Sequence, residues 1–224
     1  MNILVIGTEN QFTELRNKFG EHFTYTRLSD QADAEQYLKT SNIVFDFLLD
    51  EDPYQFDVYR TYKNLVVFVN ATKLCLAEIA YMFDHEIECE LLGFNGLPGF
   101  VNRPLLEVSV LRESQHELLK SICDQLNTKY QLVADRVGMV SPRVICMIIN
   151  EAYYTLQEGT ASRADIDAGM KLGTAYPHGP FEWAQKLGIH HVYELLEAVY
   201  EDTKDERYKI CPLLKREYLL LTQP

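Results

Sequence analysis

The sequence lacks the features that mark several specialised classes of protein. No apolar run approaches the length of a membrane-spanning helix, and the opening stretch at residues 3–6 is too short for a signal peptide and has no basic residue before it. The five cysteines are widely spread and include no Cys-x-x-Cys pair, which indicates neither a disulfide framework nor a zinc site. These absences predict a cytoplasmic protein with no membrane partner and no bound metal.

Basic residues are also in short supply. The chain has 21 Lys and Arg against 33 Asp and Glu, which gives a formal net charge of -12 at pH 7. A field of this sign repels the phosphate backbone of a polynucleotide. We therefore expect no nucleic-acid partner.

The remaining composition is that of a folded globular protein, with 224 residues of which 47% are hydrophobic and 24% charged. The first part of the chain alternates short apolar runs with polar stretches long enough for crossover helices, a pattern typical of a parallel sheet between helices. The expected strands are residues 3–6, 23–26, 43–47, 65–69, 91–94 and 105–111, and the expected crossover helices include residues 9–19 and 31–39.

Strand signals stop near Val133, where helical periodicity begins. Apolar residues recur at helical spacing from Val140 to Leu156, and Gly159 follows as a helix stop. Residues 162–165 have the spacing of a capping box, and Gly179 is followed by a proline suited to the first turn of another helix. We therefore expect an α/β domain at residues 1–132 and an all-α domain at residues 133–224.

The helical segment carries a recognisable run at residues 168–183, Ala-Gly-Met-Lys-Leu-Gly-Thr-Ala-Tyr-Pro-His-Gly-Pro-Phe-Glu-Trp. This run resembles the hallmark of the C-terminal domain of 3-hydroxyacyl-CoA dehydrogenases. Residues 150–152, 158–159 and 164–167 are similar to the family's helical hairpin, and residues 205–208 and 212–215 to its last helices. The resemblance covers most of residues 138–216, whereas the N-terminal segment is similar only in outline.

The resemblance implies a shortened Rossmann-like N-terminal domain and a C-terminal domain of the 6-phosphogluconate dehydrogenase-like type. It implies NAD-dependent oxidation of the 3-hydroxyl group of an acyl-CoA, a reaction of fatty acid metabolism. It also implies an active cleft between the domains and a homodimer formed through the helical domain. Because a fold does not transfer a function by itself, each functional residue has to be located in this sequence.

The dinucleotide loop departs from the family pattern. Of the three fingerprint glycines only Gly7 remains, while Glu9 occupies the phosphate-approaching position and Phe12 the position of close helix packing. Asp30 comes a few residues late for the ribose-binding acid. From the resemblance, the cofactor-binding residues are Gly7 and Asn70, but a bulky ring and an anion at this turn argue against ordinary NAD binding.

The catalytic residues are equally incomplete. Counted without gaps from Asn70, the family's general-base histidine falls on Gly93, and Pro142 stands where the family has a substrate-binding asparagine. The resemblance leaves Glu107 as the carboxylate partner of the missing histidine, with a loop-facing carboxylate of no catalytic role as the open alternative, and Thr72 as the hydroxyl of the serine-bearing loop.

Two further side chains near these positions are open to more than one interpretation. Lys73 is a candidate to pair with a substrate phosphate, although an exposed surface cation is the ordinary alternative. His178 is a conceivable substitute base, but a histidine that fills a hydrogen-bonding niche is the simpler interpretation.

Two hypotheses follow. The first is a divergent dehydrogenase with impaired turnover that binds NAD through an altered loop and uses Thr72, Glu107 and His178. The second is a non-catalytic dimeric homologue that binds an acyl-CoA or serves as a scaffold or regulator. Simultaneous loss of the glycine fingerprint, the histidine and the asparagine motivates the second hypothesis and favours impaired or absent dehydrogenase turnover.

Overall fold

The computed structural model describes residues 1–221, and its chain divides into two compact units, Met1–Met139 and Val140–Pro224. The division lies later in the chain than the boundary predicted at residues 132–133. The reason is that Val137 and Met139 are buried and the backbone N–H of Gly138 donates to the carbonyl of Thr72 at 2.9 Å.

The first unit is built on a seven-stranded sheet with the strand order β2-β1-β3-β4-β5-β6-β7. Neighbouring strands are parallel except for the antiparallel pair β5 and β6, so β6 and β7 run opposite to the other five. The strands are β1 (Asn2–Ile6), β2 (Thr24–Leu28), β3 (Ile43–Asp46), β4 (Val66–Asn70), β5 (Glu90–Phe94), β6 (Leu105–Val110) and β7 (Lys129–Leu132). Sequence patterns predict the first six but not β7, whose residues alternate between exposed and half-buried.

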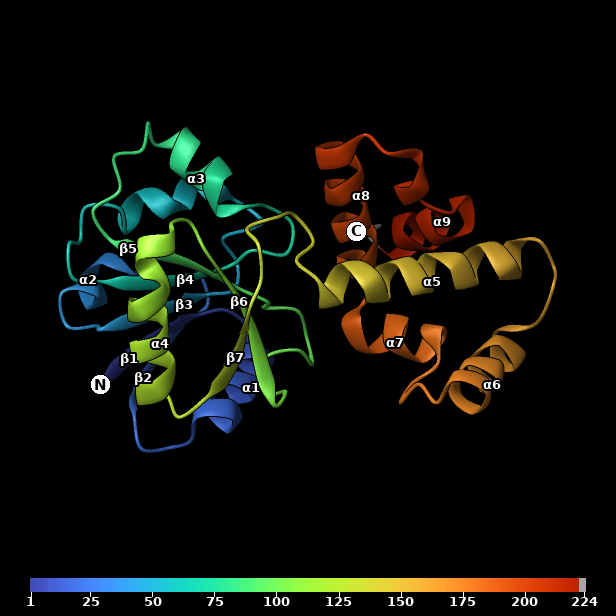
Figure 1. Cartoon of the computed structure of the whole chain (residues 1–224), viewed down its shortest axis with the longest axis horizontal. Helices are drawn as coiled ribbons and strands as arrows, with labels where there is room; N and C mark the ends of the chain where they lie inside the picture. The colour runs from blue at the N-terminus through green and yellow to red at the C-terminus, as the bar shows by residue number, and fades with distance from the viewer. Residues whose placement is uncertain (222–224) are drawn as a thin grey trace. The chain divides into compact units, whose positions relative to one another are not determined.

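Helices cover both faces of this sheet, as Figure 1 shows. The helical elements are α1 (Glu9–Phe19), α2 (Glu35–Leu38), η1 (Pro53–Val58), α3 (Leu76–Met82), η2 (Glu113–Gln115) and α4 (His116–Gln125). One buried cluster joins α1 and α4 to alternate strand residues, and a second joins α2, η1 and α3 to the remaining ones. Burial on both faces explains why the central strands are continuous runs of Val, Ile and Phe rather than alternating patterns.

The second unit is all-helical within the described residues. Its elements are α5 (Ser141–Gln157), α6 (Arg163–Thr174), α7 (Pro180–Leu187), α8 (Ile189–Thr203), η3 (Glu206–Tyr208) and α9 (Pro212–Leu221). The long helix α5 packs against α7, α8 and α9. Helix α6 contributes no buried residue, and Arg163 at its start lies over the rings of Tyr153 and Phe181, at 5.2 and 4.6 Å from their centroids, and pairs with Glu217.

The sequence analysis expected neither a membrane-spanning helix nor a metal site. Among residues 1–221, no helix is long and apolar enough to cross a membrane. Within the same residues, no group of three or more His, Cys, Asp or Glu side chains is arranged to hold a metal ion. The five cysteines are free thiols.

Candidate functional site

The carboxyl ends of β1, β3, β4 and β5 meet at one edge of the sheet, where open α/β folds bind their ligands. The turn after β1 begins at Gly7, whose N–H donates to the carbonyl of Leu28 at 3.0 Å. A Cβ added at Gly7 would lie 2.8 Å from the Gln11 Oε1 atom and 3.2 Å from the Phe47 Cβ atom. Gly7 is therefore needed for a close approach, but the approaching atoms belong to the chain itself.

The first turn of α1 is closed by a capping box. The backbone N–H of Thr8 donates to Gln11 Oε1 at 2.8 Å, and the N–H of Gln11 donates to the Thr8 hydroxyl at 3.3 Å. In a dinucleotide-binding fold, the N–H groups at this helix start face the pyrophosphate. In this chain the N–H of Thr8 is bonded instead to the Gln11 side chain, a contact that the sequence analysis did not predict.

Glu9 and Phe12 have other roles. The Glu9 carboxylate is exposed and pairs with Arg27 at 3.0 Å, and Arg27 also donates to the carbonyl of Gly7 at 3.1 Å. Phe12 packs against the α1 face of the sheet and makes an edge-on contact with Tyr25. Asp30 accepts the N–H of Ala32 at 2.8 Å and so closes its own turn.

Asn70, at the end of β4, organises a buried polar network. Its amide nitrogen donates to Asp50 Oδ2 at 2.9 Å, and its amide oxygen accepts from the Thr72 hydroxyl at 3.0 Å and from the N–H of Gly96 at 3.1 Å. A Cβ at Gly96 would lie 2.9 Å from the Asn70 side chain. The predicted cofactor ligand Asn70 and the predicted hydroxyl Thr72 are thus brought together and bonded to each other, with Thr72 fully buried.

Lys73 joins the same network through Asp50, at an Nζ–Oδ2 distance of 3.4 Å. The side chains are only 12% and 2% exposed, so Lys73 is neither the surface cation of the ordinary interpretation nor a lysine that faces solvent to meet a phosphate. Burial raises the pKa of Asp50 to about 7, against the opposing effect of the Lys73 charge. The sequence analysis assigned no role to Asp50.

A second buried carboxylate lies at the end of β3. Asp46 accepts hydrogen bonds from the Tyr59 hydroxyl at 2.8 Å and from Gln31 Nε2 at 3.2 Å. Burial raises its pKa to about 6, while these hydrogen bonds act in the opposite direction. Asp46 and Asp50 were both missed because their partners come from distant parts of the chain.

Gly93 occupies a position on β5 with no room for a side chain. A Cβ there would lie 2.3 Å from the Ser109 hydroxyl oxygen and 2.9 Å from the Cβ of Ala71, distances that real Cβ atoms do not adopt. The Ser109 hydroxyl is itself buried and has no hydrogen-bond partner. None of the six histidines lies on β5 or β6.

Glu107 lies on the neighbouring strand β6 and is 7% exposed. Asn95 contacts it twice, because the Asn95 N–H donates to the Glu107 carbonyl at 3.0 Å and the Asn95 amide lies 3.5 Å from the carboxylate. Since Asn95 precedes Gly96 in the chain, one loop connects Glu107 to the network around Asn70.

In the helical unit, the candidate residues have structural partners. Pro142 is buried in the first turn of α5. His178 is half-buried, with its Nδ1 atom 3.9 Å from Glu182. Lys171 also pairs with Glu182.

The hallmark run forms a helix corner at which Asp167 caps α7. The carboxylate of Asp167 accepts from the N–H groups of Phe181 at 2.8 Å and Glu182 at 3.2 Å. A Cβ added at Gly179 would lie 2.2 Å from this carboxyl group. The run that carries the family resemblance thus contributes a helix cap to the second unit.

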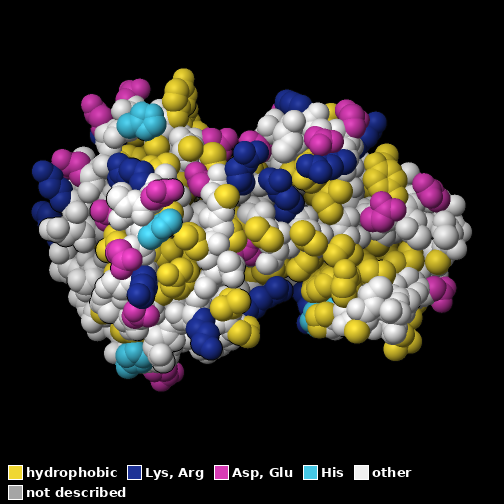
Figure 2. Space-filling model, viewed as in Figure 1, with side chains coloured by type: hydrophobic (Ala, Val, Ile, Leu, Met, Phe, Trp, Pro, Cys, Tyr) yellow, Lys and Arg dark blue, Asp and Glu magenta, His cyan; other side chains and the backbone are white. Residues whose placement is uncertain are grey.

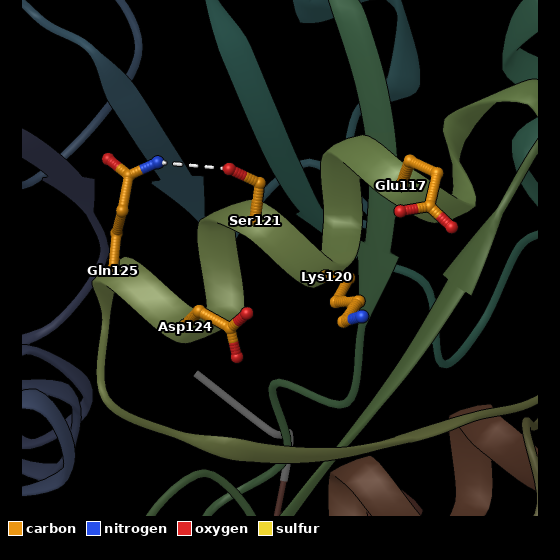
Figure 3. Close-up of a pocket in the computed structure, with 5 residues that line it drawn as sticks. All are labelled: Glu117, Lys120, Ser121, Asp124 and Gln125. Atoms are coloured by element: carbon orange, nitrogen blue, oxygen red, sulfur yellow. Dashed lines mark hydrogen bonds between the residues drawn. The ribbon is translucent and has the colours of Figure 1, made fainter.

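A surface hollow lies elsewhere on the first unit, along α4 (Figure 3). Its lining side chains are Glu117, Lys120, Ser121, Asp124 and Gln125, all exposed and all from this one helix. A single hydrogen bond of 3.3 Å joins Gln125 Nε2 to the Ser121 hydroxyl. Because no second element converges on it, we do not regard this hollow as the functional site.

Comparison with known proteins shows what the helical unit is similar to. The family model for the 3-hydroxyacyl-CoA dehydrogenase C-terminal domain matches residues 138–220. A 3-hydroxyadipyl-CoA dehydrogenase from Escherichia coli K12 is 46% identical over 88 residues, which are 39% of this chain and 18% of that protein. A 3-hydroxybutyryl-CoA dehydrogenase from Bradyrhizobium diazoefficiens is 33% identical over 117 residues, 50% of this chain and 40% of that protein. The matches therefore span less than half of these relatives.

The fold of the whole chain also has counterparts among solved structures. The (S)-3-hydroxybutyryl-CoA dehydrogenase from Ralstonia eutropha superposes with a TM-score of 0.74 over 98% of this chain and 93% of that one, at 19% sequence identity. This likeness confirms the predicted combination of a Rossmann-like α/β domain with a helical domain. Residues 138–220 thus match the C-terminal domain of 3-hydroxyacyl-CoA dehydrogenases, and the chain is similar to members of that family over this part of its length.

Proposed function

We propose that this chain is a 3-hydroxyacyl-CoA dehydrogenase homologue in which NAD-dependent hydride transfer is impaired or lost. The observation that carries the proposal is the packing at Gly93, where the Ser109 hydroxyl stands 2.3 Å from any added Cβ. A general base contributes about 10² to 10⁴ in rate, and this position cannot present one without displacing its neighbours.

The residues at the start of α1 do not fit the pyrophosphate of a dinucleotide in the ordinary geometry. The N–H of Thr8 is already bonded to Gln11 Oε1, and the same oxygen lies against Gly7. A phosphate would have to displace this cap and approach the Glu9 carboxylate. We therefore derive no hydride-transfer step for this chain.

The role that remains is that of a non-catalytic acyl-CoA-binding or scaffolding protein, acting in the cytoplasm as a homodimer. Exposed apolar side chains on the helical unit support the dimer: Val140 and Val144, on the turn before α5 and on α5 itself, are each 54% exposed, and Leu172 on α6 is 88% exposed. Figure 2 shows hydrophobic side chains gathered on this unit over α5 and α7. Burial of such side chains between two copies is a common driving force for association.

The decisive experiment is an activity assay with purified protein, acetoacetyl-CoA and NADH across pH 6 to 9. We expect no NADH consumption above background and, by calorimetry, no heat of NAD binding. Measurable heat on titration with acetoacetyl-CoA alone supports the binding role. Turnover that disappears in Glu107→Gln and Thr72→Val, but persists in the surface control Ser121→Ala, contradicts the proposal and makes the chain a working dehydrogenase.

The dimer is tested separately by light scattering on a size-exclusion column. We expect the mass of two chains for the wild type and of one chain for Val144→Asp. A monomeric wild type contradicts the dimer without bearing on hydride transfer.

A further inference from the structure

The segment between β7 and α5 is fastened to the first unit at both of its ends. At its start, the N–H of Val133 donates to the carbonyl of Val108 at 2.9 Å. Near its end, the N–H of Gly138 donates to the carbonyl of Thr72 at 2.9 Å, while Val137 and Met139 are buried. The segment therefore contacts Thr72 directly through its backbone carbonyl, whereas the Thr72 hydroxyl bonds to Asn70.

Asp135 fastens the middle of the same segment to α3. Its two carboxylate oxygens accept hydrogen bonds from the N–H groups of Leu76 at 2.7 Å and Ala77 at 3.0 Å. These are the first residues of α3, and the preceding Cys75 supplies no side-chain cap to them. The first two N–H groups of α3 are thus capped by a residue nearly sixty positions away, while Glu78 accepts the N–H of Cys75 at 2.7 Å. Hydrogen bonds to a charged acceptor are stronger than neutral ones.

These two attachments enclose the loop that carries Thr72. The loop begins at Asn70 and ends where α3 starts, so Gly138 holds its middle and Asp135 holds its end. At the end of the segment that leads to α5, Gly138 and Met139 have positive φ angles of 84° and 45°. Left-handed backbone of this kind is unusual for a methionine and marks the point where the held segment ends before α5.

We propose that Asp135 is a positioning residue that fastens the segment before α5 to the Thr72 loop, so that the two are ordered together and released together. Displacement of the Thr72 loop, by a ligand or by mutation, then loosens the segment that leads into the helical unit. This inference does not depend on whether the protein is a catalyst.

Trypsin and hydrogen exchange test the proposal on the full chain, because Arg136 lies in the segment and is exposed. In Asp135→Ala, we expect cleavage after Arg136, seen as a new C-terminal fragment by mass spectrometry, to be at least about tenfold faster than in the wild type. The amide of Gly138 is expected to exchange faster by a similar factor, together with those of Leu76 and Ala77.

The control is Asp205→Ala, which removes a comparable aspartate cap from the N–H of Arg207 in the helical unit. It should leave both readouts at Arg136 and Gly138 unchanged. The amide of Val67, on the buried strand β4, reports global unfolding. Asp135→Asn, which keeps the shape and one acceptor, should give an intermediate effect and serves if the alanine variant does not fold.

Two results would overturn the proposal. If Leu76 and Ala77 exchange faster while Gly138 and the Arg136 cleavage stay at wild-type rates, Asp135 is only a helix cap. If Val67 accelerates as much as Gly138, the variant is globally unstable and no local fastening exists.

Discussion

Replacing Gly93 by alanine tests whether this position can accept a side chain at all. The new Cβ would overlap the Ser109 hydroxyl at 2.3 Å and the Ala71 Cβ at 2.9 Å. Overpacking of this kind costs about 1–3 kcal/mol, and the reduced backbone freedom of alanine returns about 0.5–1 kcal/mol. We expect a net loss of about 1–2 kcal/mol in the free energy of unfolding for Gly93→Ala, and a larger loss for Gly93→His.

The companion variant is Ser109→Ala, which removes the nearest clashing atom. Because that hydroxyl is buried without a partner, its removal should be neutral or stabilising by up to about 1 kcal/mol. The double variant Gly93→Ala/Ser109→Ala should therefore be more stable than the sum of the single effects, with a coupling of about 1 kcal/mol. Urea unfolding gives the free energy of unfolding of all four proteins, which are compared at a constant m-value.

Two outcomes of this cycle would refute the reasoning. One is strict additivity of the two substitutions, which would mean that Ser109 does not limit position 93. The other is a Gly93→His protein as stable as the wild type, which would mean that an imidazole fits.

Three further predictions concern buried charges and the helical unit. Because the folded state raises the pKa of Asp50 to about 7 and that of Asp46 to about 6, the folded protein binds protons more tightly than the unfolded chain, and the free energy of unfolding should fall as pH rises from about 4 to 7. Asp50 accounts for at most about 4 kcal/mol of this fall. In Asp50→Asn, the difference in the free energy of unfolding between pH 5 and pH 8, measured with urea, should therefore be smaller than in the wild type. An unchanged difference would mean that the pH dependence comes from other groups. Gly179→Ala should lower the free energy of unfolding by about 2 kcal/mol because its Cβ meets the Asp167 cap, and in thermal melts its effect should not add to that of Asp167→Ala; full additivity would count against the clash. Arg163→Ala should cost about 1–2 kcal/mol and speed hydrogen exchange throughout α6, with Arg163→Lys intermediate; unchanged exchange would show that α6 is held by other contacts.

Much of the framework follows from local sequence patterns. The strands β1 to β6, helix α1 and the long helix α5 are all marked by apolar period or by capping residues, because those signals act within a few residues. The inward orientation of Phe12 was also readable, since Phe12, Leu15 and Phe19 recur at helical spacing on one face. The prediction of Phe12 as an obstacle followed the fingerprint pattern instead of this period.

The site was harder to predict because its bonds join distant residues. Asp50 meets Asn70 and Lys73 from another loop, and Asp135 reaches α3 from beyond β7. No local pattern encodes such partners. The capping role of Gln11 is the exception, because a Thr-x-x-Gln spacing before a helix is a local signal that could have been read.

The capped first turn of α1 has a consequence for the folding of the first unit. An oxygen supplied by Gln11 does for this helix what a nucleotide oxygen does in cofactor-dependent relatives of the fold. The first turn of α1 therefore has its cap within the chain itself, so the geometry of this turn does not require a bound small molecule.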